Sequence, residues 1–333
     1  MKNRFLLILG FALLFVTGCE EDPSSIGSTL FNKEFEIIEV SSDSLAQSGS
    51  YFKVDTILYV SSRRMLLGDA GDVESSIVMK YFVSYPDSLQ DKLENDQITF
   101  TGAKARFTKN YLYGDSNAVL GFSVHELKNN WTTTGFNKDS LSFLEYDQSI
   151  DIAFNKTETD STLEFNLDVD VVNSWIDKVA FDGVKDNNGI ILKPQGVSKI
   201  VGFPTINSSG VVSNIELYYT DNSGRSDTLF LGQFIDVHDV EGTLPSDANN
   251  NYYLQSGLPV YMSYHFDLSF LPSNAVLNTA ELQINMDSLN TTFGSVASDT
   301  LYLYMLEDST SNTIQETYRG AILTRTGNTY SGD

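Results

Sequence analysis

The chain has few of the residues that most often carry chemistry, and it is short of positive charge. Its 333 residues include one cysteine and three histidines. A single cysteine excludes internal disulfides and leaves no thiol cluster for a metal, and His125, His238 and His265 have no HxH or HExxH spacing. Lys and Arg number 21 against 44 Asp and Glu, for a net charge of −23. This charge excludes nucleic-acid binding through a basic patch.

Nucleotide-binding and hydrolase motifs are also missing. The sequence has no GxxxxGK[ST] or GxGxxG loop, and Gly121–His125 fails the GxSxG pattern because its fifth position is histidine. Carboxylates are so numerous that no pair of them can be singled out as a glycosidase dyad. His125 and His265 fall in expected strands, where we expect exposed imidazoles. We therefore expect a protein that is not an enzyme, with a polysaccharide-degrading enzyme as the weakest alternative.

Residues 1–18 read as a secretory signal peptide. Lys2 and Arg4 precede an apolar segment from Phe5 to Val16 that only Gly10 interrupts. About a dozen apolar residues are too few to cross a bilayer of roughly 30 Å. The residues 16–19, Val-Thr-Gly-Cys, resemble a bacterial lipobox, which implies that Cys19 is acylated and anchors the protein to a membrane.

An acidic triplet follows the cysteine at once. Glu20, Glu21 and Asp22 resemble the signal that sends Bacteroidota lipoproteins to the outer face of the outer membrane. The alternative is a solvated tether, with the protein facing the periplasm. We expect a lipid-anchored outer-membrane protein that faces the cell exterior.

Beyond a polar, flexible tether at 19–32, the pattern is almost wholly β. Leu163, Phe165 and Leu167 alternate with polar residues, which is the period-two burial of one sheet face. Short strands separated by Gly, Asn, Asp and Ser clusters are typical of a β-sandwich. One stretch, 170–179, has helical spacing instead, with Asp168 or Asp170 placed to cap it. We expect this short helix to close one end of the sandwich with Trp175 in the core.

Similar segments occur twice in the same order. Residues 55–58 correspond to 227–230, and 122–127 correspond to 301–306. We therefore expect an all-β fold of tandem jelly-roll-like sandwiches at 33–222 and 227–333. The second copy ends before any counterpart of the helix, so we expect it to be partial or completed by another segment.

The first copy also resembles a known module. The order of 66–68, 77–82, 98–107, 122–127, the 171–175 helix and 188–192 is similar to the DNRLRE or disaggregatase-related β-sandwich. Residues 19–27 resemble the start of a Bacteroidota surface lipoprotein family of unknown function. The resemblance implies jelly-roll modules, some of which bind acidic polysaccharides such as alginate.

Two sets of side chains are candidates for binding. Exposed aromatic rings stack on sugar C–H faces, and Tyr111, Tyr113 and Trp131 lie in or beside expected loops. Packing within the sandwich is the alternative for each ring. Asp69, Asp72 and Glu74 cluster in a loop with glycine, and their oxygens suit Ca²⁺, although polar turn residues explain the cluster as well.

Asp-Ser and Asp-Thr pairs recur along the chain and resemble a Bacteroidota O-glycosylation sequon. Their hydroxyl residues are Ser44, Thr56, Ser88, Ser140, Ser161, Thr228, Ser288, Thr300 and Ser309. Turns that enter strands are the alternative reading. For the whole protein we expect a non-catalytic binding module, with polysaccharide as its partner. The rival hypothesis is an accessory lipoprotein that binds other envelope proteins.

Overall fold

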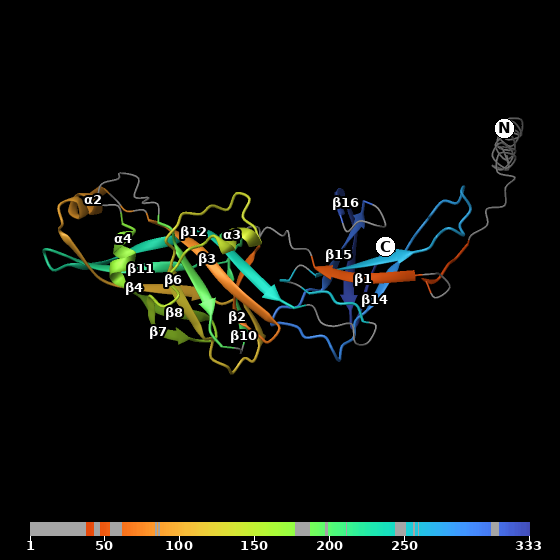
Figure 1. Cartoon of the computed structure of the whole chain (residues 1–333), viewed down its shortest axis with the longest axis horizontal. Helices are drawn as coiled ribbons and strands as arrows, with labels where there is room; N and C mark the ends of the chain where they lie inside the picture. The colour runs from red at the N-terminus through yellow and green to blue at the C-terminus, as the bar shows by residue number, and fades with distance from the viewer. Residues whose placement is uncertain are drawn as a thin grey trace, which may run out of the picture. The chain divides into compact units, whose positions relative to one another are not determined.

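The computed structural model describes residues 38–42, 47–53, 62–83, 85, 87–176, 187–196, 199–210, 212–243, 251–255, 257–258, 260–307 and 313–333. The expected signal peptide, Cys19 and the tether at 19–32 lie outside these residues. Within the described part the chain is mostly β, with three short helices (Figure 1). The expected all-β fold is therefore confirmed.

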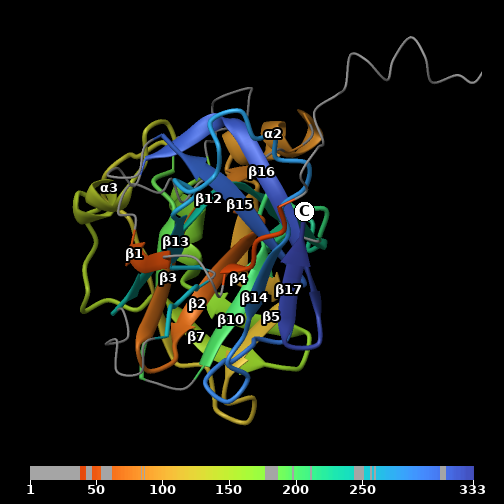
Figure 2. The same cartoon turned by 90° about the vertical axis from the view of Figure 1, so that its right-hand side faces the viewer.

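The strands form three sheets. In chain order they are β1 (Gln47–Lys53), β2 (Arg64–Asp69), β3 (Val73–Val83), β4 (Ile98–Thr108), β5 (Tyr111–Gly114), β6 (Phe122–Glu126), β7 (Ala153–Glu158), β8 (Thr162–Leu167), β9 (Ile190–Pro194), β10 (Lys199–Pro204), β11 (Asn214–Asp221), β12 (Ser226–Gly242), β13 (Val260–Phe266), β14 (Leu282–Asn285), β15 (Thr300–Leu306), β16 (Ile314–Thr326) and β17 (Thr329–Gly332). An 11-stranded sheet runs β5-β10-β2-β3-β12-β11-β4-β8-β7, with β9 pairing β3 and β6. A 4-stranded sheet, drawn in blue in Figure 2, has the order β14-β17-β16-β15, and β1 pairs with β13.

Contacts divide the chain into two units. The smaller is Met1–Gln47 with Phe266–Phe270, and the larger is Ser48–His265 with Leu271–Asp333. The strands above belong to the larger unit, apart from the first residue of β1 and the last residue of β13.

The core follows the alternation read from the sequence. Leu163, Phe165 and Leu167 on β8 are fully buried, as the period-two pattern predicted. Their neighbours on β4 and β11 alternate in the same way, with the polar residues pointing outward. Phe107 is at the centre of this core, because its ring contacts both Phe165 and Phe203. In β8, β4 and β11 one face is therefore apolar and the other carries polar side chains, whereas β3 and β9 bury apolar side chains on both faces.

The helix expected near 170–179 is α4, Val169–Ser174. The Asp168 side chain accepts a hydrogen bond from the Asp170 backbone N–H at 2.9 Å, which satisfies one unpaired donor of the first turn. Trp175 is buried as expected, with its ring stacked on Tyr81 and its Nε1–H donated to Glu126. The rest of the expected segment, from 177, lies outside the described residues.

Two further helices were not expected. The first is α2, Asp87–Glu94, which buries Leu89 and Leu93, one helical turn apart. The second is α3, Lys138–Ser142, whose first turn is closed by a reciprocal capping box between Asn137 and Ser140.

Strand pairing extends past the expected boundary at 222–227. The short turn at 222–225 joins β11 to β12, and β12 then pairs with both β11 and β3 of the large sheet. Its hydrogen bonds with β3 continue to Gly242. In the other direction, β1 lies in the expected first sandwich but pairs with β13, which lies in the expected second one. Of the repeated segments, 55–58 lie outside the described residues, while 122–127 and 301–306 are both strand segments over most of their length.

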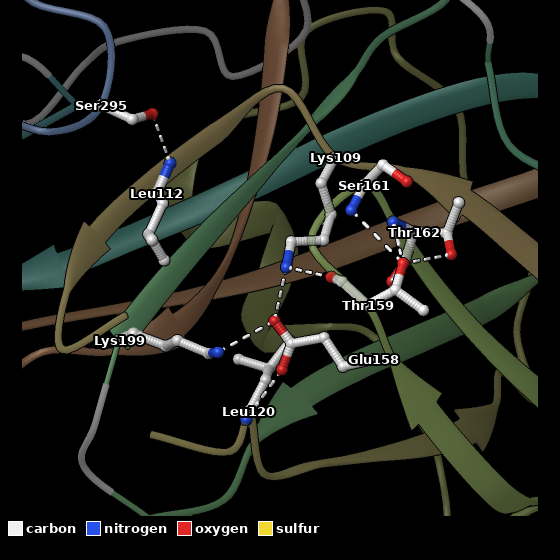
Figure 3. Close-up of polar contacts among 9 residues, drawn as sticks. All are labelled: Lys109, Leu112, Leu120, Glu158, Thr159, Ser161, Thr162, Lys199 and Ser295. Atoms are coloured by element: carbon white, nitrogen blue, oxygen red, sulfur yellow. Dashed lines mark hydrogen bonds and ion pairs between the residues drawn. The ribbon is translucent and has the colours of Figure 1, made fainter. Parts of the chain in front are cut away.

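A largely buried ionic cluster joins the ends of three strands, β4, β7 and β10 (Figure 3). Glu158, the last residue of β7, accepts hydrogen bonds from Lys109 Nζ at 2.7 Å and Lys199 Nζ at 2.9 Å. Its second oxygen accepts the Leu120 backbone N–H at 3.3 Å. Burial would raise the pKa of Glu158, but these hydrogen bonds outweigh burial and hold the pKa below its ordinary value.

The cluster predicts a stability cost for Glu158→Gln. Lys199 is only 3% exposed, so the substitution would leave a buried ammonium without its carboxylate. We expect a loss of roughly 3–5 kcal/mol in the free energy of unfolding, measured by urea denaturation. The matched control is Glu241→Gln, which removes a surface ion pair with Lys138 and should cost no more than about 0.5 kcal/mol. Equal losses in the two variants would contradict this account.

The same cluster predicts an acid dependence. Because the folded-state pKa of Glu158 is lowered, its contribution is present above the pKa of unfolded glutamate and is lost as the pH falls through the folded value. The difference in unfolding free energy between the wild type and Glu158→Gln should stay constant near neutral pH and shrink below about pH 4. Urea titrations at a series of pH values measure it. A difference that grows in acid would refute the assigned role.

Candidate functional site

Strand register places a defined set of side chains on the outer side of the large sheet. Residues paired directly across antiparallel strands point to the same face. One row across β7, β8, β4, β11 and β12 therefore consists of Phe154, Asn166, Lys104, Glu216 and Phe230. The adjacent row across β8, β4, β11, β12 and β3 consists of Glu164, Arg106, Asn214, Gly232 and Phe82. We call these two rows, with Phe234, the outer face.

The outer face carries phenylalanines at both ends. Phe154 lies at the β7 end, and Phe230, Phe82 and Phe234 lie at the β12 end, all between 37% and 56% exposed. Phe234 is the extra residue of a β-bulge between Gln233 and Ile235, and its ring contacts Phe82 at a centroid distance of 6.2 Å. Gly232 lies among these rings, and nothing lies within 4 Å of where its Cβ would be. The aromatic end is therefore open and free of crowding side chains.

Charged side chains occupy the middle of the outer face. Lys104 forms an ion pair with Glu164. Arg106 Nε lies 3.3 Å from Glu164 Oε1 and 3.7 Å from Glu216 Oε1, so it bridges the two carboxylates. Tyr218 donates its hydroxyl hydrogen to Glu216 Oε2 at 2.6 Å. Two cations and two anions thus form one network across three strands, with no net charge.

Electrostatics favour the charged form of Glu164 and the protonated form of Tyr218. The hydrogen bond from Lys104 is the main cause that lowers the pKa of Glu164, with Arg106 adding to it. The hydrogen bond to Glu216 is the main cause that raises the pKa of Tyr218, so the phenol stays protonated and donating. The middle of the outer face is therefore a fixed set of polar groups, flanked by apolar rings. Such a surface suits an extended, amphipathic ligand.

The aromatic residues proposed from sequence lie elsewhere. Tyr111 and Tyr113 are half-buried in β5, a strand rather than a loop, and the Arg64 guanidinium sits 4.6 Å from the Tyr111 ring centroid. Burial raises the pKa of Tyr111. Neither residue belongs to the outer face.

Trp131 is a core residue in the described structure. It is 6% exposed, contacts Phe136, and donates its Nε1–H to the Asn188 carbonyl at 2.8 Å. Its ring is consequently not offered to a ligand. The sequence could not show this, because the residues that cover it come from distant segments.

The acidic residues proposed for Ca²⁺ form a hairpin turn between β2 and β3. Asp69 accepts the Gly71 backbone N–H at 3.1 Å, and Glu74 lies 3.7 Å from Lys193. Asp72 is exposed in the turn itself. Across the described ranges, no group of three or more His, Cys, Asp or Glu side chains is placed to hold a metal ion. The structure thus does not bring this set together as ligands.

The expectation of an exposed His125 was wrong. His125 is buried, with Nδ1 at 2.7 Å from the Ile150 carbonyl and Nε2 at 2.8 Å from the Ser123 hydroxyl. Ser123 is buried as well, so the pair has a structural role in β6. His265 is exposed, as expected.

The structure also locates several of the proposed glycosylation residues. Among the described hydroxyls of the Asp-Ser and Asp-Thr pairs, Ser88, Ser161 and Ser288 are exposed, whereas Ser140 is engaged in the α3 capping box. Cys19 lies outside the described residues. In the part of the chain that the structure describes, no helix has the length and apolar character to cross a membrane.

Comparison with known proteins does not assign the chain to a family. No protein-family model matches the chain, and no curated protein is significantly similar to it. The resemblance to a surface lipoprotein family therefore stays a prediction, and the outer face must be interpreted from its own chemistry.

The position of Trp131 yields a test. Trp131→Ala should lower the free energy of unfolding by about 3–5 kcal/mol, because it removes a buried indole. Trp131→Phe keeps most of the packing and should cost less, with only the hydrogen bond to Asn188 lost. Chemical denaturation measures both. If Trp131→Ala leaves stability unchanged, the ring is not part of the core.

Proposed function

We propose that this protein is a cell-surface lipoprotein that binds a carbohydrate polymer through the outer face without cleaving it. The observation that carries the proposal is the arrangement of exposed phenylalanines on either side of a fixed polar row. A sugar ring has an apolar C–H face and a rim of hydroxyls. The phenylalanines supply apolar contact for the first, and the charged and amide side chains supply hydrogen bonds for the second.

The size of the outer face suits a polymer better than a single sugar. The row from Phe154 to Phe230 crosses four strand spacings, which is about 19 Å at the usual separation of neighbouring strands. The sheet face is also open at both ends of the row, where the exposed rings lie. These features favour a chain that crosses the sheet and extends beyond it.

The proposed location rests on the N-terminal sequence. The signal peptide at 1–18, the lipobox-like residues at 16–19 and the acidic residues that follow support acylation of Cys19 and exposure on the outer membrane. Each buried CH₂ contributes about 0.8 kcal/mol, so several acyl chains would hold the protein durably on the membrane. A tethered binding module in that position would retain polysaccharide at the cell surface.

Binding fits the two carboxylates of the outer face better than hydrolysis does. Glu164 and Glu216 both approach Arg106 Nε, so their Oε1 atoms are separated by at most about 7 Å, which does not exclude the spacing of a glycosidase dyad. A glycosidase also needs a general acid whose pKa is raised. The pKa of Glu164 is lowered by its cationic partners, so this residue is suited to an ion pair.

The proposal predicts that Phe154→Ala and Phe230→Ala each weaken polysaccharide binding about tenfold, because each removes an exposed ring from one end of the row. Isothermal titration calorimetry of the purified full chain against a panel of polysaccharides measures the affinities. The matched control is Phe143→Ala, since Phe143 is a 72% exposed phenylalanine at the end of α3 and is not one of the outer-face residues.

Two results would overturn the proposal. The first is the lack of binding to any member of the panel. The second is binding whose affinity is unchanged by both outer-face substitutions.

A further inference from the structure

We infer that the outer face selects uncharged glycans and that Glu164 and Glu216 act as specificity-determining residues against acidic ones. The inference rests on the proposed function and adds the class of polymer. Its basis is the way in which the two cations of the face are already occupied.

Lys104 and Arg106 are the positive side chains of the outer face, and both are paired. Lys104 contacts Glu164, and Arg106 lies within 3.7 Å of both Glu164 and Glu216. A uronate carboxylate would compete with these partners for cations whose charge the two glutamates already neutralise. It would also meet the repulsion of the second carboxylate at short range.

The net charge of the whole chain also disfavours the binding of acidic glycans. A net charge of −23 repels a polyanion before it reaches the sheet. An uncharged sugar meets neither barrier, because hydroxyls accept hydrogen bonds from ammonium and guanidinium groups and donate to carboxylates without breaking the ion pairs. Glu164 and Glu216 thus exclude one class of ligand while still serving the other.

The strand register also predicts how a bound glycan is oriented on the sheet. Phe154 and Phe230 occupy the two ends of a single row that runs perpendicular to the strands. The polar groups Asn166, Lys104 and Glu216 lie between them in that row. A glycan that contacts both rings must therefore lie across the strands, over the charge network.

The first arm of the test uses the wild-type full chain. Calorimetry compares neutral polymers (a mixed-linkage glucan, a xylan and a mannan) with alginate and polygalacturonate, at low and high salt. We expect at least one neutral polymer to bind about tenfold more tightly than either uronate polymer. We also expect its affinity to change little with salt, since no net charge is neutralised.

The second arm reverses the selection. Glu164→Gln combined with Glu216→Gln frees Lys104 and Arg106, and we expect affinity for the uronate polymers to rise about tenfold at low salt. The matched control is Glu74→Gln with Glu241→Gln, which removes two carboxylates from surface ion pairs. Glu74 lies about 26 Å along β3 from Phe82, so this control leaves the outer face intact.

The outcomes separate this inference from the proposed function. Wild-type binding of uronates as tight as that of neutral polymers, and sensitive to Phe230→Ala, overturns the selectivity and leaves the binding face in place. No gain of uronate binding in the double variant, when that variant unfolds like the wild type, overturns the role of the two carboxylates. Failure of every polymer to bind removes the proposed function itself.

Discussion

The antiparallel register of β7, β8, β4, β11 and β12 is the constraint on which the rest depends. Because side chains alternate across a strand, a one-residue slip of any of these strands would send its outer residues into the core. Burial of Phe165, Ala105 and Leu217 prevents such a slip. The same pairing that fills the core therefore fixes Lys104 beside Glu216 on the other face.

Two ionic clusters have different roles in this framework. Glu158 and its two lysines are largely buried where β7 ends and β10 begins, so they contribute to stability and are costly to break. The Lys104, Arg106, Glu164 and Glu216 network is partly exposed, and exposed ion pairs contribute little to stability. Its value lies in holding polar groups in place on an open surface, where they present hydrogen-bonding partners between the phenylalanines.

The sequence predicted individual strands and the α4 cap better than it predicted which segments pack against one another. Alternation in 163–167 and the cap at Asp168 depend on local spacing, and both predictions were confirmed. The leucine pair of α2 has helical spacing, but two buried positions are too few to predict a helix from the sequence. Pairing of Phe154 with Phe230 across a common row depends on strand order, which no local pattern contains. For the same reason no local pattern could decide between ligand contact and packing for Trp131, which distant residues cover.

The most direct test of the central claim, that the outer face is a glycan site, is a crystal structure of the full chain with a bound oligosaccharide. The account predicts sugar rings over Phe154 and Phe230, with the oligosaccharide lying across β8, β4 and β11. An oligosaccharide bound instead at β5, against Tyr111 and Tyr113, with the outer face empty, would contradict it.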